Sequence, residues 1–249
     1  SAEGAGMDLS RKSRLAEEEK AEVYQEIHRT ALAAIVAHSK WREGDWAFHG
    51  GNALRLAHGW PRWSQDLDMM VAREKAEAKD LDRIMEKTLD SVRHRAALIW
   101  PDSDLSLKHP KRHKNPAVQA YGVRWSHPMR QGAVNVKVEL YPVDREMLSR
   151  YETEAVLIES ADGVGYRYPV GTEAAIWADK IAALAGRDEV KWRDLFDLQW
   201  LSRARGGVRK ESEEDLAERL QTTFDIYGDD PETVRDALRG RLGDGTFDA

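Results

Sequence analysis

The chain contains no cysteine among its 249 residues. This absence excludes disulfide bonds and metal sites built from thiolates, and it is compatible with a cytoplasmic protein. Long apolar runs are also missing, since none approaches the roughly 20 residues that a membrane-spanning helix needs. No secretory signal pattern is present. We therefore expect a cytoplasmic protein that does not enter a membrane.

An excess of positive charge is lacking as well. The formal net charge is −6, which argues against a uniformly basic nucleic-acid-binding protein. A local basic surface stays open, because phosphate binding depends on where the charge lies. The densest basic run extends from Lys108 to Lys114. Together with Arg124 and Arg130 it is either a set of phosphate contacts or a solvated loop.

Histidines and tryptophans give no clear site by themselves. The eight histidines form no metal-ligand spacing such as His-Glu-x-x-His. His49 is either a phosphate contact or a buried, hydrogen-bonded side chain. Among the nine tryptophans, Trp177, Trp192 and Trp200 fall in helical patterns, and we expect them in the core rather than stacked on bases.

The most informative stretch begins with two adjacent glycines, Gly50 and Gly51, at the start of a predicted short helix. Glycines let backbone N–H groups approach phosphates, and a helix N-terminus adds a positive dipole. A turn then leads to a predicted strand that carries Asp66 and Asp68. Alternate strand residues share a face, so these two carboxylates project together while Leu67 points to the core. The order suits a nucleoside triphosphate and Mg²⁺, although an isolated Asp-x-Asp is also common as a structural pair.

A second predicted strand, residues 133–141, alternates apolar and polar side chains. The alternation places Glu139 on the polar face with Lys137. Three carboxylates from two neighbouring strands suit divalent metal ions that activate a hydroxyl for attack on phosphorus. The alternative is that Glu139 is a solvated residue of the strand face.

The predicted elements divide the chain into an α+β part and a helical part. We expect helices at 13–39, 48–58, 74–95, 173–185, 191–203, 215–227 and 231–242, and strands at 66–71, 97–99, 103–107, 121–125 and 133–141. Thr172 is a suitable N-cap for the helix at 173–185. We therefore predict a small mixed sheet flanked by helices in residues 7–160 and a C-terminal helical bundle in residues 161–249.

An ordered set of motifs resembles the AbiEii/AbiGii toxin family, which are nucleotidyltransferases of the DNA polymerase β-like superfamily. The first motif covers Gly50 to Leu54, Arg62, Ser64 and Asp66 to Asp68; the second is Lys137 to Glu139; the third covers Lys180 to Leu184, Arg187 and Arg193 to Leu198. Asn52 stands where the family usually has threonine. The spacing between Arg187 and Arg193 is slightly longer than usual.

The resemblance implies an N-terminal polymerase β-like nucleotidyltransferase domain and a role for each motif residue. It implies a metal site at Asp66, Asp68 and Glu139, which are also catalytic. It implies that Lys180 contacts the triphosphate and is catalytic with Asp197. The nucleotide-binding residues it implies are Gly50, Gly51, Arg62, Ser64, Lys137, Lys180, Arg193 and Asp194. The alternatives are a lysine at a helix edge and a salt-bridge network joining Asp194 and Asp197 to Arg187 and Arg193.

The resemblance also implies a function. It is that of a Mg²⁺-dependent toxin that transfers NMP from an NTP to an acceptor hydroxyl, with tRNA 3′ ends as the acceptor class. Such a toxin belongs to a toxin–antitoxin or phage-defence pair, so a cognate antitoxin is expected, and we expect a monomer. Transfer to a small molecule or a protein side chain would use the same residues. A non-catalytic binding protein is disfavoured by the presence of all three carboxylates.

Ser64 lies two residues before Asp66 and is a candidate regulatory site. A phosphate there would add negative charge beside the metal carboxylates and would repel the triphosphate. Phosphorylation of Ser64 is therefore a hypothesis for inhibition.

Overall fold

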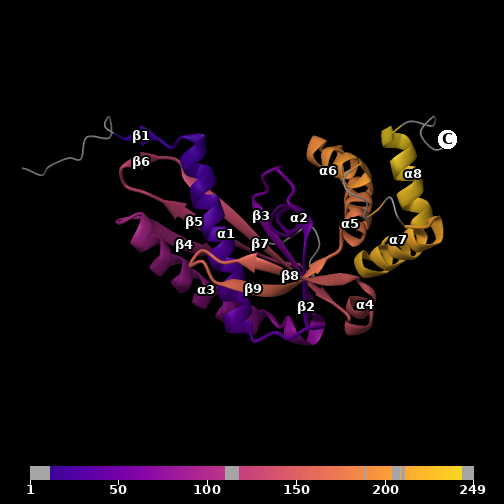
Figure 1. Cartoon of the computed structure of the whole chain (residues 1–249), viewed down its shortest axis with the longest axis horizontal. Coiled ribbons are helices and arrows are strands. Elements are labelled where there is room, and N and C mark those ends of the chain that lie inside the picture. Colours follow the sequence, from indigo (N-terminus) through magenta and orange to yellow (C-terminus); the bar gives the residue numbers. More distant parts are fainter. Residues whose placement is uncertain (1–11, 110–117, 188, 204–207, 209–210, 243–249) are drawn as a thin grey trace, which may run out of the picture.

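The computed structural model describes residues 12–109, 118–187, 189–203, 208 and 211–242. Most of the predicted basic run, residues 110–114, lies outside these described residues. The centre of the molecule is a mixed seven-stranded sheet with the order β4-β5-β7-β3-β2-β9-β8 (Figure 1). Its strands are β2 (Trp46–His49), β3 (Asp66–Ala72), β4 (Asp104–Lys108), β5 (Gln119–Ser126), β7 (Ala133–Val143), β8 (Thr153–Glu159) and β9 (Gly165–Gly171). A separate two-stranded pair joins β1 (Ser13–Arg14) to β6 (Arg130–Gln131).

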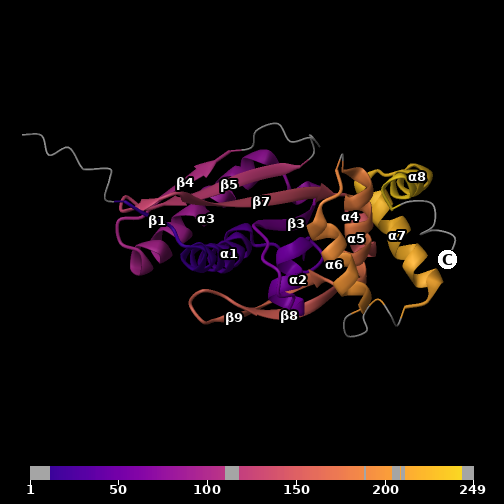
Figure 2. The same cartoon turned by 90° about the horizontal axis from the view of Figure 1, so that it is seen from above.

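The helices of the described residues fall into two groups. Four belong to the sheet-bearing part: α1 (Glu17–Ser39), α2 (Gly50–His58), α3 (Ala78–Ile99) and α4 (Arg145–Arg150), with a short 3₁₀ turn, η2 (Arg73–Lys75). The other four follow the last strand: α5 (Glu173–Gly186), α6 (Trp192–Arg203), α7 (Glu213–Tyr227) and α8 (Pro231–Leu242). Figure 2 shows this second group beside one end of the sheet. Within the described residues, no helix combines the length and apolar character needed to cross a membrane.

Strand alternation sorts the side chains of β3 onto two faces, as the sequence predicts. Leu67, Met69 and Val71 are fully buried in the main core with residues of α1 and α3. Met70 and Ala72 point to the opposite face, where they pack in a smaller core with residues of α4 and α5. Because residues two apart share a face, Asp66 and Asp68 also lie on this second face, away from α1 and α3.

The helix α5 begins immediately after the last strand. The Oγ1 atom of Thr172 accepts a hydrogen bond of 3.2 Å from the backbone N–H of Ala175, which confirms the predicted N-cap. The helices α5, α7 and α8 share an apolar core built from Ala182, Leu184, Ala185, Phe224, Val234 and Leu238. The predicted C-terminal helical bundle is therefore present.

Some elements differ from the sequence prediction. The predicted strand at 97–99 is the last turn of α3, because Ala96 continues the buried stripe of that helix. The strands β1, β2, β6, β8 and β9 and the helix α4 are not among the predicted elements, and residues 13–14, predicted as the start of the first helix, form β1. The predicted division at 160/161 falls in the turn between β8 and β9. Since β9 pairs in parallel with β2, the sheet continues as far as Gly171.

Candidate active site

The candidate active site lies on the second face of the sheet, where three neighbouring strands bring polar side chains together. Parallel pairing of β3 and β7 sets Asp66 opposite Lys137 and Asp68 opposite Glu139. Antiparallel pairing of β2 and β3 sets His49 opposite Asp68. The predicted grouping of Asp66, Asp68 and Glu139 is therefore present, and it follows from strand register.

Charge repulsion is concentrated at Asp68. The pKa of its carboxyl is raised to about 7, chiefly by burial and also by the neighbouring carboxylates of Glu139 and Asp66, while the charge of His49 opposes the rise. Burial also raises the pKa of Asp66 above its ordinary value, against the pull of Lys137. A buried group of like charges is stabilised by a cation placed among them.

The donor set fits a hard divalent cation such as Mg²⁺, because it consists of carboxylate oxygens. Among the described residues, no three acidic or histidine side chains already surround one point as a finished metal site. In this structure Oε1 of Glu139 contacts the ammonium group of Lys137, and its Oε2 accepts a 3.3 Å hydrogen bond from Tyr141. Lys137 thus supplies positive charge where a metal ion would otherwise bind Glu139.

The two glycines are required by close packing against the site. Gly50 has a φ of +79°, and a Cβ atom there would overlap the carboxylate of Asp68. A Cβ atom on Gly51 would lie 2.7 Å from the Oγ atom of Ser64. The turn at the start of α2 therefore lies directly against Asp68 and Ser64. Phosphate contact by these glycines stays a prediction.

Asn52 stabilises the segment that leads into β3. Its Nδ2 donates hydrogen bonds to the carbonyl oxygens of Asp66 at 2.7 Å and Ser64 at 3.2 Å. The buried ring of His28 adds a 3.0 Å bond from Nε2 to the carbonyl of Gln65. Burial lowers the pKa of His28 to about 4, so the ring is neutral; its Nδ1 accepts from Arg55. The asparagine at position 52 therefore supports the backbone beside the carboxylates. No motif or spacing in the sequence singled out His28.

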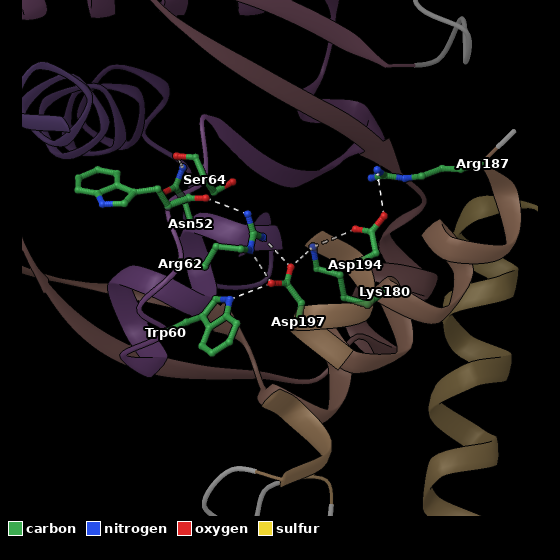
Figure 3. Close-up of polar contacts among 9 residues, drawn as sticks. Asn52, Trp60, Arg62, Ser64, Lys180, Arg187, Asp194 and Asp197 are labelled. Atoms are coloured by element: carbon green, nitrogen blue, oxygen red, sulfur yellow. Dashed lines mark hydrogen bonds and ion pairs between the residues drawn. The ribbon is translucent and has the colours of Figure 1, made fainter. Parts of the chain in front are cut away.

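Asp197 is the shared partner of three side chains, two from the loop between α2 and β3 and one from α5 (Figure 3). Arg62 donates two hydrogen bonds to it, from Nε at 2.8 Å and Nη2 at 2.7 Å. Trp60 donates a third from Nε1 at 2.8 Å, and the ammonium nitrogen of Lys180 lies 2.8 Å from Oδ2. Burial opposes ionisation, but Arg62 and Lys180 outweigh it and hold the pKa of Asp197 below its ordinary value. The side chain of Asp197 is 0% exposed. From this buried place it positions Lys180 and Arg62.

Asp194 has a similar place one turn earlier on α6. Its carboxylate is fully buried, 3.0 Å from Nη1 of Arg187 and 3.7 Å from the ammonium of Lys180 (Figure 3). A direct nucleotide contact is difficult for a buried side chain. Both aspartates therefore lie in a salt-bridge network, as the alternative interpretation predicts. Arg187 belongs to this network, but Arg62 and Lys180 take the place predicted for Arg193.

Positive charges surround the carboxylates from three elements. The charges of Lys137, Arg193 and Arg187 all lower the pKa of Asp66, so they lie within electrostatic reach of it. Lys180 of α5 is paired with Asp197 and shares Asp194 with Arg187. Cations near a carboxylate group that holds metal suit a triphosphate ligand.

A second buried group, missed in the sequence, connects the sheet to α5. Asp179 precedes Lys180 and accepts hydrogen bonds from Tyr151 at 2.6 Å and Tyr227 at 3.3 Å. Its Oδ2 lies 3.5 Å from Nδ1 of His49. Burial lowers the pKa of His49, but Asp179 outweighs this and raises it above the ordinary value. Of the two alternatives for His49, a phosphate contact or a buried side chain, the structure shows the buried side chain.

The tryptophan predictions are correct in two cases and wrong in one. Trp177 and Trp200 are partly buried against the main core. Trp192, however, is 85% exposed. It is the first residue of α6, and no described element covers that turn.

The chain is similar to known proteins in sequence pattern and in fold. The model of the family described as nucleotidyl transferase AbiEii toxin, type IV toxin–antitoxin system, matches residues 30–249. A candidate nucleotidyltransferase from H. pylori has a similar fold, with a TM-score of 0.53, 22% identity, and coverage of 90% of this chain and 83% of that one. The protein JHP933 from Helicobacter pylori is similar, with a TM-score of 0.52, 20% identity, and coverage of 90% and 89%. No curated protein sequence matches the chain significantly.

Proposed function

Because this chain belongs to the AbiEii family of nucleotidyl transferase toxins, we propose that it transfers NMP from Mg²⁺–NTP to the 3′ hydroxyl of tRNA. Family membership makes the chain a nucleotidyltransferase of a toxin–antitoxin system. The metal, the acceptor and the residue roles are our proposal. We further propose a monomer that acts in the cytoplasm and is neutralised by a cognate antitoxin.

The observation that carries the proposal is the carboxylate group of Asp66, Asp68 and Glu139, with cations on its rim. Strand register puts Asp68 beside Glu139, and burial with mutual repulsion raises the pKa of Asp68 to about 7. Such a group gains stability from a divalent cation. Lys137, Lys180 and Arg193 then match the negative charge of a triphosphate.

The reaction follows from these placements. The acceptor hydroxyl oxygen attacks the α-phosphorus, a new P–O bond forms, and the bond to the bridging oxygen breaks. The pyrophosphate leaves with that electron pair, and Glu139 receives the hydroxyl proton. Mg²⁺, held by the three carboxylates when bound, would neutralise charge on the phosphates. Lys180 and Arg193 contact the triphosphate, while Asp194 and Asp197 position Lys180 from beneath the surface.

The direct test uses α-³²P-labelled NTPs, Mg²⁺ and total tRNA. We expect one NTP to label tRNA at its 3′ end, and we expect labelling to disappear with EDTA and in Asp66→Asn. Asp90→Asn is the matched control, since Asp90 lies in an exposed pair with Arg93 on α3. Absence of label on RNA, with label on a small molecule or on protein, would contradict the proposed acceptor and leave nucleotidyl transfer intact.

A further inference from the structure

The first turns of α6 present exposed aromatic side chains beside the candidate site. Trp192 is 85% exposed and Phe196 is 51% exposed. They are four residues apart, so they share one face of the helix. We call this pair the aromatic edge of α6. Large apolar groups left in water in this way commonly mark an interaction site.

The aromatic edge is rigidly connected to the charged site. The ring of Phe196 lies 5.1 Å from the ring of Trp60, which in turn lies 4.5 Å from Trp200. Trp60 also donates its indole N–H to Asp197, the residue that holds Lys180. The row of rings therefore runs from Trp200 through Trp60 to the half-exposed Phe196, and the exposed Trp192 lies one turn earlier on the same helix face.

The charge beside the edge favours a polyanion. Arg193 is exposed between the two aromatic residues in the sequence, and its charge reaches Asp66, as does that of Arg187. The acidic residues of α6, Asp194 and Asp197, lie on its buried side and are paired with cations. Just before α6, the exposed Glu189 adds one negative charge, and the exposed Lys191 offsets it with one positive charge.

We propose that the aromatic edge of α6 stacks on the unpaired bases at the 3′ end of the RNA acceptor, with Arg193 contacting its backbone. Aromatic faces interleaved with cations are the usual means of binding single strands without reading their sequence. The inference rests on the proposed function and deepens it, because it names the surface that holds the acceptor rather than the NTP.

The test compares substitutions of Trp192 that separate stacking from apolar contact. Trp192→Phe keeps an aromatic face, whereas Trp192→Leu keeps an apolar side chain without one. We expect the KM for total tRNA, at saturating NTP, to rise about tenfold in Trp192→Leu and Phe196→Leu and to change little in Trp192→Phe. The KM for NTP should stay constant. Tyr166→Leu is the control, since Tyr166 is an aromatic residue of β9 that is 44% exposed.

Three outcomes would overturn the inference. An unchanged KM for tRNA in Trp192→Leu would remove the aromatic edge from acceptor binding. A raised KM for NTP would assign it to the nucleotide instead. A normal KM for tRNA with a loss of neutralisation by antitoxin, or of self-association, would make the edge a protein-docking surface.

A binding measurement separates this inference from the proposed function. The probe is a fluorescently labelled single-stranded oligoribonucleotide, and the readout is the rise of its fluorescence anisotropy on binding. If the wild type transfers nothing to RNA but Trp192→Leu still binds the oligoribonucleotide at least tenfold more weakly, the stacking surface stands and the acceptor proposal fails. If the wild type and Trp192→Leu label RNA equally, the acceptor proposal stands and the stacking surface fails.

Discussion

The guanidinium of Arg62 and the carboxylate of Asp197 form a two-bond pair, with N–O distances of 2.8 and 2.7 Å. The pair joins the loop before β3 to α6, across 135 positions of the chain. It also fixes Lys180, whose ammonium lies 2.8 Å from the same carboxylate. One buried carboxylate therefore holds cations from two motifs in a single arrangement.

Removal of this carboxylate should be strongly destabilising. We expect Asp197→Ala to lower the free energy of unfolding by about 3–5 kcal/mol, because Arg62 and Lys180 would keep buried charges without their partner. Urea unfolding measures the change. Asp90→Ala, which breaks an exposed pair on α3, should have little effect. Equal effects of the two substitutions would contradict the role of Asp197.

Asp68→Asn should abolish transfer and yet stabilise the metal-free protein at pH 8. The pKa of Asp68 is about 7 in the fold against an ordinary 3.8. Between these values the folded state binds more protons than the unfolded state, so this group makes stability fall as pH rises. Asp68→Asn has no carboxyl group to titrate at this position, so its stability does not fall in this way as pH rises. Thermal unfolding in EDTA at pH 5 and pH 8 measures it, and Mg²⁺ should stabilise the wild type alone. A variant less stable than the wild type at pH 8 would disprove this account.

Gly50→Ala and Gly59→Ala form a matched pair on α2. Both glycines have positive φ, +79° and +72°, so alanine should cost each about 1 kcal/mol of stability through the backbone. Only Gly50 lies against Asp68, whereas nothing lies within 4 Å of a Cβ atom on Gly59. We expect transfer to be lost in Gly50→Ala and kept in Gly59→Ala. Kinetics and urea unfolding of both variants decide the point.

Ser64→Asp should reduce kcat/KM at least about tenfold, because it adds negative charge beside the carboxylates and the turn at Gly51. Ser64→Ala should keep most of the activity. Ser149→Asp, on the exposed side of α4, is the control for an added charge elsewhere. Full activity in Ser64→Asp would end the hypothesis that phosphorylation at this position inhibits the enzyme.

His28 should make the fold sensitive to mild acid. Its pKa is about 4 in the fold against an ordinary 6.5, so between these values the unfolded chain binds the extra proton. Stability from this group is present above pH 6.5 and is lost as pH falls toward 4, by about 3 kcal/mol in full. His28→Gln cannot titrate. The advantage of the wild type in urea unfolding should therefore shrink between pH 7.5 and pH 5, and a constant difference would contradict it.

Periodicity predicted the long elements well, because α1, α3 and β7 each bury one regular stripe. It missed β8 and β9, whose exposed side chains alternate poorly, and it missed β2, which has only four residues and is buried on all of them. The carboxylate grouping was predictable, since strand parity places Asp66 and Asp68 on one face. The partners of Asp197 and Asp179 were not, because they come from elements far apart in the chain. Trp192 was misplaced because helical spacing does not reveal which turn lacks a neighbour.

Thr172 is the single residue between the end of β9 and the start of α5. With so short a connection, α5, which carries Lys180, cannot move away from the sheet that carries Asp66 and Asp68. We therefore expect substrates to enter and products to leave by rearrangement of side chains such as Lys137, without hinged opening of the two parts. In small-angle scattering, the apo and NTP-bound enzymes should have the same radius of gyration.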